Sequence, residues 1–383
     1  MPLHPARGAL PLGLSLLIAA GAAQAQLAVE TLAMEPLAPA DAHRIYLSDP
    51  TMPHLVDGRI HVIDGAAMKY LGMVGSGFAG SSVVSPDRKT LYVATTYLSR
   101  LQRGTRTDVI EAYDTGDLTL RYEIEIPAKH AQSLPIKALT AATGDGRFLL
   151  VQNATPATSI TVVDLAQKRV ASEIANPGCW GVIPWPSAPA KFTTVCGDGT
   201  LATFELNSEG KAQEPLVTKS FFDPDRDPVF MHYEMLGDEL LMVSYYGALY
   251  SVQLAGAAPT VREPWNFIDA AARKQRWAPG GYALFALDPD TRRLYVGMHD
   301  QQAEGSHKNP AKELWVLDLA ARKRIARLPG DLALSMAMTR SAPRRLYLLS
   351  AADNKLVSFD PANPRARKRS APFGETPIYL ELH

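Results

Sequence analysis

A pair of short strand-like segments recurs along the whole chain. In each copy, a segment rich in Leu, Tyr and Val precedes a turn, and a second segment then ends in two hydrophobic residues and an acidic residue or its substitute. The clear copies are RIYLSD (44–49) with RIHVID (59–64), TLYVAT (90–95) with VIEAYD (109–114), FLLVQN (148–153) with ITVVDL (160–165), RLYVGM (293–298) with LWVLDL (314–319), and RLYLLS (345–350) with LVSFD (356–360). Two weaker copies, FTTVCGDGTLATFEL (192–206) and LLMVSYYGALYSVQL (240–254), fill the middle.

The spacing of these copies predicts the fold. Their terminal residues are Asp64, Asp114, Asp164, Glu205, Gln253, Asp318 and Asp360, and successive differences are 50, 50, 41, 48, 65 and 42. Such a period is typical of four-stranded propeller blades. The sequence therefore predicts an all-β, seven-bladed β-propeller over residues 40–383. Because a closed ring must join its ends, we expect either 376–383 or 27–35 to add a strand to the first or last blade.

Two irregular segments interrupt the repeat. Residues 266–277 are rich in alanine and offer Asn266 or Asp269 as a helix cap, which predicts a short helix between blades five and six. Residues 299–313 are polar and turn-prone, which predicts a long loop inside blade six.

The N-terminal residues indicate export. An apolar run from Ala9 to Ala23 ends in Ala23-Gln24-Ala25, a pattern that signal peptidase accepts. We interpret residues 1–25 as a signal peptide cleaved after Ala25 and residues 26–39 as an N-terminal arm, with a membrane anchor as the alternative. No later segment is long and apolar enough to span a bilayer.

The chain has two cysteines, Cys179 and Cys196. In an oxidising compartment two cysteines usually pair, and these lack the spacing of a redox C-x-x-C motif or a zinc site. The spacing favours a structural disulfide over a reactive thiol pair, and a loop of this size would contribute about 3 kcal/mol of stability.

Charge and motifs exclude several functions. The 39 basic and 39 acidic residues balance, so nothing suggests binding to nucleic acid or to an anionic membrane. The string GSGFAG (75–80) matches a dinucleotide fingerprint, but the residues after it predict strands, so we interpret it as a loop between blades. His54, His61, His299 and His307 are interpreted as solvated or locally hydrogen-bonded imidazoles rather than metal ligands. No catalytic set is evident.

Aromatic residues in predicted loops form the other candidate feature. They are Trp180, Trp185, Tyr245, Tyr246 and Trp277. Exposed Trp and Tyr residues on a rigid platform would suggest a protein interface. The alternative is that each of them packs between blades.

Several loop strings together resemble the heavy subunit of the periplasmic quinoprotein amine dehydrogenases, whose known types oxidise methylamine or aromatic amines. The strings are TTYLSRLQRGTRTDVIEAYD (95–114), QNATPATSITVVDL (152–165), GCWGVIP (178–184) with VCGDG (195–199), SYYG (244–247), WAPGGY (277–282) and EGSHKNPAKELWVLDL (304–319). The likeness runs from about residue 40 to the C-terminus and is nearer the aromatic amine type.

This resemblance implies a non-catalytic propeller that pairs with a small, disulfide-rich light subunit as a two-plus-two tetramer. In that family the light subunit carries tryptophan tryptophylquinone, primary amines become aldehyde and ammonia, and electrons pass to a blue copper protein such as azurin or amicyanin. The family's heavy-subunit disulfide matches Cys179 and Cys196. A phenylalanine that lines the substrate channel matches Phe78, whose alternative role is to fill the propeller core.

Two other functions stay compatible with the sequence. A stand-alone periplasmic propeller would bind a ligand or scaffold a complex without any redox partner. A lyase or lactonase on the same fold would require a metal cluster near the propeller axis, which the scattered histidines do not suggest.

Overall fold

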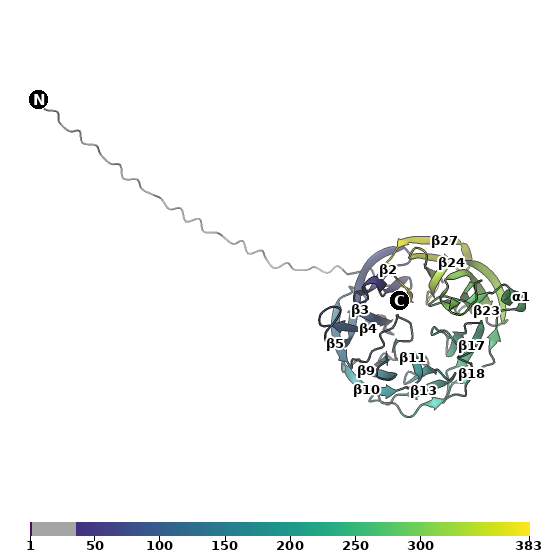
Figure 1. Cartoon of the computed structure of the whole chain (residues 1–383), viewed down its shortest axis with the longest axis horizontal. Helices are drawn as coiled ribbons and strands as arrows, with labels where there is room; N and C mark the ends of the chain where they lie inside the picture. The colour runs from purple at the N-terminus through teal and green to yellow at the C-terminus, as the bar shows by residue number, and fades with distance from the viewer. Residues whose placement is uncertain (2–35) are drawn as a thin grey trace. The chain divides into compact units, whose positions relative to one another are not determined.

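The computed structural model describes Met1 and residues 36–383, so the predicted signal peptide, most of the predicted arm and the segment 27–35 lie outside the described residues. Residues 36–383 form a ring of antiparallel sheets around a central axis (Figure 1). Counted within these residues, the ring has seven blades, as the repeat predicted.

In each blade the strands follow one another from the axis outward. Blade 1 contains β28 (Tyr379–Leu382), β1 (Arg44–Asp49), β2 (Gly58–Asp64) and the first part of β3 (Lys69–Val84). Blade 2 contains the rest of β3, β4 (Thr90–Leu98), β5 (Arg106–Asp114) and β6 (Leu120–Ile126). Blade 3 contains β7 (Thr140–Ala142), β8 (Phe148–Asn153), β9 (Ser159–Asp164) and β10 (Arg169–Ala175).

Blade 4 contains β11 (Cys179–Pro184), β12 (Lys191–Cys196), β13 (Leu201–Glu205) and β14 (Leu216–Val217). Blade 5 contains β15 (Glu234–Leu236), β16 (Glu239–Val243), β17 (Ala248–Gln253) and β18 (Thr260–Val261), with β19 (Trp265–Asn266) also on β17. Blade 6 contains β20 (Ala278–Pro279) and β21 (Phe285–Asp288), both on β22 (Arg293–His299), then β23 (Ala311–Asp318) and the first part of β24 (Lys323–Met338). Blade 7 contains the rest of β24, β25 (Leu346–Ser350), β26 (Lys355–Asp360) and β27 (Asn363–Pro372).

The acidic residue that marks each repeat has a local structural reason. All seven markers are the last residue of the third strand of their blade. Where the marker is Asp, its carboxylate accepts a hydrogen bond from a backbone N–H in the following turn, as Asp114 Oδ1 does from Gly116 N at 2.7 Å and Asp360 Oδ1 from Ala362 N at 2.7 Å. Aspartate favours such turns because its short side chain reaches the backbone two or three residues on.

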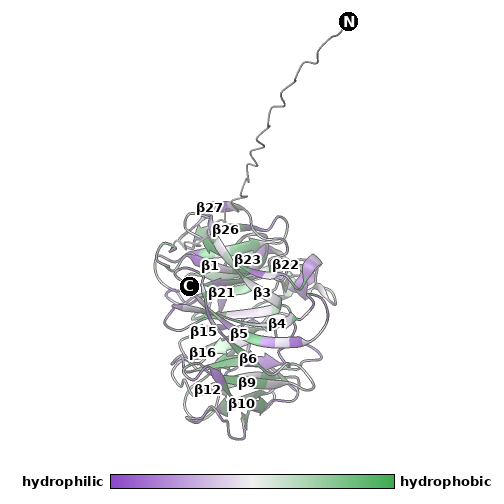
Figure 2. Cartoon of the chain, turned by 90° about the vertical axis from the view of Figure 1, so that its left-hand side faces the viewer, coloured by the Kyte–Doolittle hydropathy of each residue, from purple (hydrophilic) through white to green (hydrophobic). Residues whose placement is uncertain are grey.

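The hydrophobic core lies between neighbouring blades. Every residue of β8 and β9 is buried, because both faces of these middle strands are covered by other blades. One cluster joins Tyr92 and Ile110 of blade 2 to Leu149 and Val163 of blade 3. Figure 2 shows hydrophobic residues along the stacked strands. This two-sided burial explains why the strands alternate only partly between apolar and polar residues.

The C-terminal segment closes the ring. Strand β28 pairs with β1 in antiparallel register, from Ile45 opposite Leu382 to Ser48 opposite Tyr379. Of the two closing segments that the sequence offered, 376–383 supplies the strand. Because β1 comes from the start of the ring, this pairing joins its two ends.

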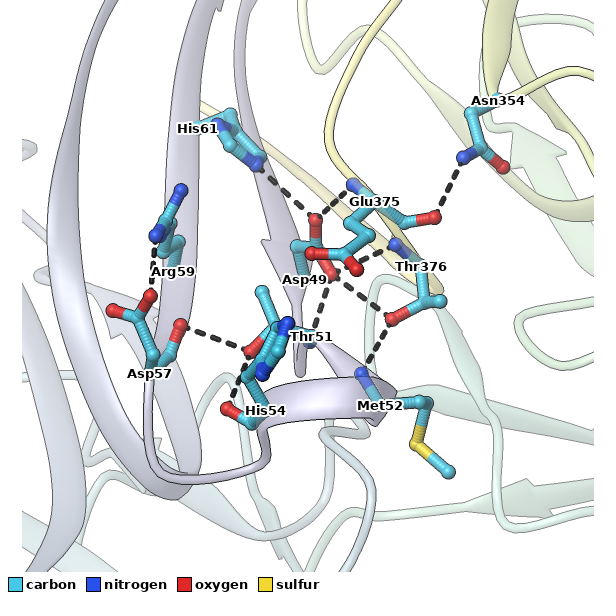
Figure 3. A network of polar contacts seen from close by, with 10 residues as sticks. All are labelled: Asp49, Thr51, Met52, His54, Asp57, Arg59, His61, Asn354, Glu375 and Thr376. Carbon is cyan, nitrogen blue, oxygen red and sulfur yellow. Dashed lines mark hydrogen bonds and ion pairs between the residues drawn. The ribbon is translucent and has the colours of Figure 1, made fainter. Parts of the chain in front are cut away.

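A buried carboxylate holds the segment that leads into β28 (Figure 3). Asp49, which is 1% exposed, accepts hydrogen bonds from the backbone N–H groups of Glu375 at 2.6 Å and Thr376 at 3.1 Å. It also accepts from Thr51 N at 2.9 Å and contacts His61 Nε2 at 3.3 Å. We call these residues the Asp49 clamp. The clamp ties the incoming strand to the hairpin of blade 1.

The predicted insertion contains helix α1 (Ala270–Lys274). Asp269 caps it, since its Oδ1 accepts a hydrogen bond from Ala272 N at 2.8 Å, whereas Asn266 belongs to β19. The predicted long loop of blade 6 joins β22 to β23 and contains the short 3-10 helix η2 (Ser306–Lys308), while η1 (Met52–His54) lies in the first hairpin. Both irregular segments are therefore confirmed.

The interpretation of GSGFAG as a loop between blades is wrong. These residues lie inside β3, a 16-residue strand whose first part pairs with β2 and whose second part pairs with β4. The pairing register shifts on both sides of Phe78, and Gly77 and Ala79 there have φ values of 51° and 55°. Glycine adopts this left-handed conformation without steric cost, so the segment bulges where the sequence suggested a turn.

The described part of the predicted arm contacts blades 1 and 2. Leu37 N donates a hydrogen bond to Gly116 O at 2.8 Å, and Ala38 O accepts one from the Arg44 guanidinium at 2.5 Å. Among the described residues, no helix has the length and apolar character needed to cross a membrane.

Candidate functional site

Most of the loop features singled out in the sequence gather on one side of the ring. In an antiparallel blade, the loop between the second and third strands and the connection to the next blade emerge at the same end. We call this side the upper face and define it by the second-to-third-strand loops 50–57, 99–105, 154–158, 197–200, 244–247, 300–310 and 351–354. Phe78, the cysteines, Tyr245, Tyr246 and Trp277 all lie at this end of their strands or connections.

Phe78 lies at the bend of β3, opposite Thr96 of β4, and is half-buried. A hydrogen bond from the neighbouring strand stabilises the bend, since Thr95 Oγ1 donates to Ser76 O at 2.5 Å. A side chain on Gly77 would approach Thr95 Oγ1 to 2.5 Å, so this position has no room for a Cβ. Phe78 is thus a half-buried residue on a backbone bend that close contacts hold in place.

The two cysteines form a disulfide. Cys179 begins β11, Cys196 ends β12, and the two residues face each other across the strand pair. Both are nearly buried, and Gly197 N continues the pairing by donating to Gly178 O at 2.9 Å. The structural disulfide that the sequence favoured is therefore present in the structure, at the upper end of blade 4.

The aromatic candidates divide into buried and accessible residues. Trp185 is fully buried at the opposite end of β11, where its Nε1 donates to Thr193 Oγ1 at 2.7 Å, and Trp277 is also buried. For these two, packing between blades is the correct alternative. Trp180 and Tyr245 are half-buried, and Tyr246 is 44% exposed.

Tyr245 and Tyr246 lie at the boundary between blades 5 and 6 on the upper face, where a cavity opens. Tyr245 stacks on His307 of the long loop with ring centroids 4.3 Å apart. The neighbouring cavity has a volume of about 400 Å³ and is lined by Tyr246, Asn266, Arg273, Trp277 and Gln302. An aromatic and arginine lining of this kind is common where proteins bind other proteins.

The four histidines that the sequence singled out lie apart. His54 is exposed in η1, His61 belongs to the Asp49 clamp, and His299 is buried at the end of β22. Burial lowers the pKa of both His299 and His307. Within the described part of the chain, no group of three or more His, Cys, Asp or Glu side chains is arranged to hold a metal ion.

The tryptophans of this chain do not fit a substrate-accessible quinone. Such a cofactor requires two tryptophan rings in contact, and within the described residues Trp277 and Trp315 form such a pair, with centroids 5.6 Å apart. Trp315 is fully buried, and the Arg327 guanidinium covers both rings. The Trp315 ring is therefore closed to an amine in solution, so the pair does not form an accessible site.

Sequence reasoning missed two groups of residues. The first is the Asp49 clamp, in which residues more than 300 positions apart in the sequence form hydrogen bonds. The second is a charged cavity on the propeller axis that is lined by residues of every blade. Neither group has a local motif, because ring closure alone brings its members together.

Comparison with known proteins extends these observations. A protein-family model described as "Methylamine dehydrogenase heavy chain (MADH)" matches residues 41–380. The methylamine dehydrogenase heavy chain of Methylobacillus flagellatus is 27% identical over 91% of this chain and 87% of its own length. That of Paracoccus versutus is 28% identical over 92% of this chain and 82% of its own length.

Solved structures agree on the fold. A putative 6-phosphogluconolactonase from Bacteroides fragilis is 12% identical, with a TM-score of 0.61 over 90% of this chain and 98% of its own. A dihydro-heme d1 dehydrogenase is 16% identical, with a TM-score of 0.57 over 91% of this chain and 68% of its own. At such identities the likeness shows the architecture alone. The family model, in contrast, covers nearly the whole ring, and this chain belongs to the methylamine dehydrogenase heavy chain family.

Proposed function

We propose that this chain is the non-catalytic heavy subunit of a periplasmic amine dehydrogenase that prefers aralkylamines to methylamine. In this proposal residues 1–25 direct export and are removed after Ala25. The mature chain binds a small, disulfide-rich light subunit in a two-plus-two tetramer. Electrons leave the complex through a blue copper protein such as azurin or amicyanin.

The observation that carries this proposal is the family match over residues 41–380. The match supports a subunit of an amine-oxidising enzyme, and the loop strings that are similar to the aromatic amine type support the substrate preference. The disulfide on the upper face supports the oxidising compartment, since disulfides persist outside the cytosol.

The tryptophan tryptophylquinone of the light subunit would supply the oxidising group that takes two electrons from the amine. The tasks left to this chain are binding and exclusion of water. We assign Phe78 to the wall of the substrate channel, because its half-buried ring is held on a rigid bend of the upper face. A benzyl side chain provides an apolar surface that an aryl ring of a substrate can contact.

Co-expression with a light subunit tests the proposed function. The mature chain alone should not oxidise phenethylamine, tyramine or methylamine with an artificial electron acceptor. The complex should oxidise all three, and kcat/KM should be higher for the two aralkylamines. Amine oxidation by the isolated chain, or a failure of the two subunits to co-purify, would contradict the proposal.

Replacement of Phe78 tests the channel wall. In the assembled enzyme we expect Phe78→Ala to lower kcat/KM for phenethylamine about tenfold, because an apolar contact of this size is worth 10-fold or more in specificity. Methylamine has no ring to contact, so its kcat/KM should change little. Phe221→Ala, which removes a half-buried ring from the outer groove between blades 4 and 5, is the matched control. An unchanged ratio between the two amines would exclude this role.

A further inference from the structure

A charged cavity runs along the axis of the propeller. Two adjoining cavities of about 380 and 300 Å³ share Lys137, Pro184, Tyr233, Arg340, Tyr379 and Glu381 in their linings. The inner strand of every blade contributes to these linings, namely β28, β3, β7, β11, β15, β21 and β24. We call this combined space the axial cavity. Its walls are formed mainly by these inner strands, while Arg340 at its edge is exposed to solvent.

The cations of the axial cavity are only partly neutralised. Lys137 Nζ lies 3.3 Å from Glu234 Oε2 and donates to Tyr233 O at 3.1 Å. Arg88 and Arg340 follow the inner strands β3 and β24, at the side of the ring opposite the upper face. Among the described residues, neither guanidinium has a hydrogen-bond or ion-pair partner. Burial, and then the nearby charge of Arg340, lowers the pKa of Arg88.

A buried carboxyl group faces the same space. Glu381 is 8% exposed, and its Oε1 accepts a hydrogen bond from Val84 N at 3.2 Å. Its Oε2 has no partner within the described part of the chain, although it lies in a region lined by polar groups. Burial raises the pKa of Glu381, and in its protonated form this carboxyl can donate an O–H. A buried polar atom without a partner indicates a missing ligand or water.

We propose that the axial cavity binds a small oxyanion, with phosphate or carboxylate oxygens held between Arg88 and Arg340. A guanidinium presents a planar fork of donors that matches such oxygens, and two unpaired forks can hold one anion from two sides. Tyr233 and Tyr379 line the same cavity and their hydroxyls can add neutral donors, as can the Glu381 carboxyl when it is protonated. Arg88 and Arg340 lie at the end of the cavity opposite the upper face, whereas Lys137 and Tyr233 lie in connections that emerge at the upper face. Anion binding is measured without any amine, so its test is separate from that of amine oxidation.

Calorimetric titration of the full mature chain tests the proposal. Inorganic phosphate and malonate are titrated separately at constant ionic strength, which distinguishes a phosphate site from a carboxylate site. We expect one anion per chain. Arg340→Gln and Arg88→Gln should each weaken binding about tenfold or more, since each removes charge-assisted hydrogen bonds. Arg226→Gln, at a side chain that is 88% exposed and outside the cavity, should bind like the wild type.

Two results would overturn the proposal. Absence of binding for both anions would exclude the site. Equal affinity of the wild type and both cavity variants would show that the anion binds elsewhere on the surface. Circular dichroism melting curves confirm that each variant is folded, so that lost binding reports on the cavity.

Discussion

Asp49→Ala is expected to lower the free energy of unfolding by about 3 kcal/mol. The substitution removes one carboxylate but leaves the backbone N–H groups of Thr51, Glu375 and Thr376 without their acceptor. Leaving buried donors unsatisfied costs about 1–3 kcal/mol, and bonds to a charged group are at the upper end. The loss falls on the segment that closes the ring, so urea unfolding monitored by circular dichroism should shift to lower denaturant.

The contribution of Asp49 should also depend on pH. Burial alone would raise its pKa, but hydrogen bonds from His61 and from the backbone of Glu375, Thr51 and Thr376 outweigh burial and hold the pKa well below its ordinary value of 3.8. A lowered pKa means that the stabilisation is complete above about pH 4 and is lost as the pH falls further. The difference between wild type and Asp49→Asn should therefore be constant near neutrality and shrink in acid.

Asp57→Asn is the matched control for this experiment. Asp57 lies in the same hairpin, but its side chain is 55% exposed and pairs with Arg59 at the surface. Exposed pairs contribute about 0–1 kcal/mol, so this variant should unfold almost like the wild type. If Asp49→Ala and Asp57→Asn unfolded alike, the clamp would have no energetic role.

Loss of the disulfide is the second large effect. In the double variant Cys179→Ala/Cys196→Ala, we expect the free energy of unfolding to fall by about 3 kcal/mol, because the unfolded chain regains the freedom of a 17-residue loop. The native strands should persist, since β11 and β12 also pair through their backbones. Denaturant titration of both proteins gives the difference.

Reduction provides the control for the disulfide. With dithiothreitol present, wild type and double variant should unfold at similar denaturant concentrations, because neither then has the cross-link. A gap that remains under reducing conditions would point to lost packing of the two buried sulfur atoms instead.

The architecture was predictable because the repeat is local. Asp64 and Asp360 each end a strand and begin a turn, and this chemistry can be recognised in any single copy. The bend at Phe78 was not predictable, because Gly77 permits either a turn or a bulge, and pairing with β4 decides between them. Burial of Trp185 likewise depends on the neighbouring blade, which contributes Leu240 and Met242 to the same cluster.

The two sites also differ in whether the sequence could predict them: the disulfide could be predicted and the axial cavity could not. The disulfide followed from compartment and composition, since a chain with two cysteines has one possible intramolecular pairing. The unpaired guanidinium groups of Arg88 and Arg340 and the unpartnered Oε2 of Glu381 could not be recognised, because in the sequence these residues look like ordinary surface residues. Only in the folded ring, where the inner strands meet around the axis, do these residues line one cavity.

Pairing of β28 with β1 has a consequence for how the protein is made. During synthesis, β1 emerges with an unpaired inner edge, and Leu380 and Leu382, which pair with this edge, follow more than 300 residues later in the chain. An unpaired edge strand readily joins other chains. A chain that has not yet closed its ring can still be translocated in an unfolded state. If such a chain is released before β28 pairs with β1, the exposed edge of β1 favours aggregation. Yield in the cell should therefore depend on holding chaperones.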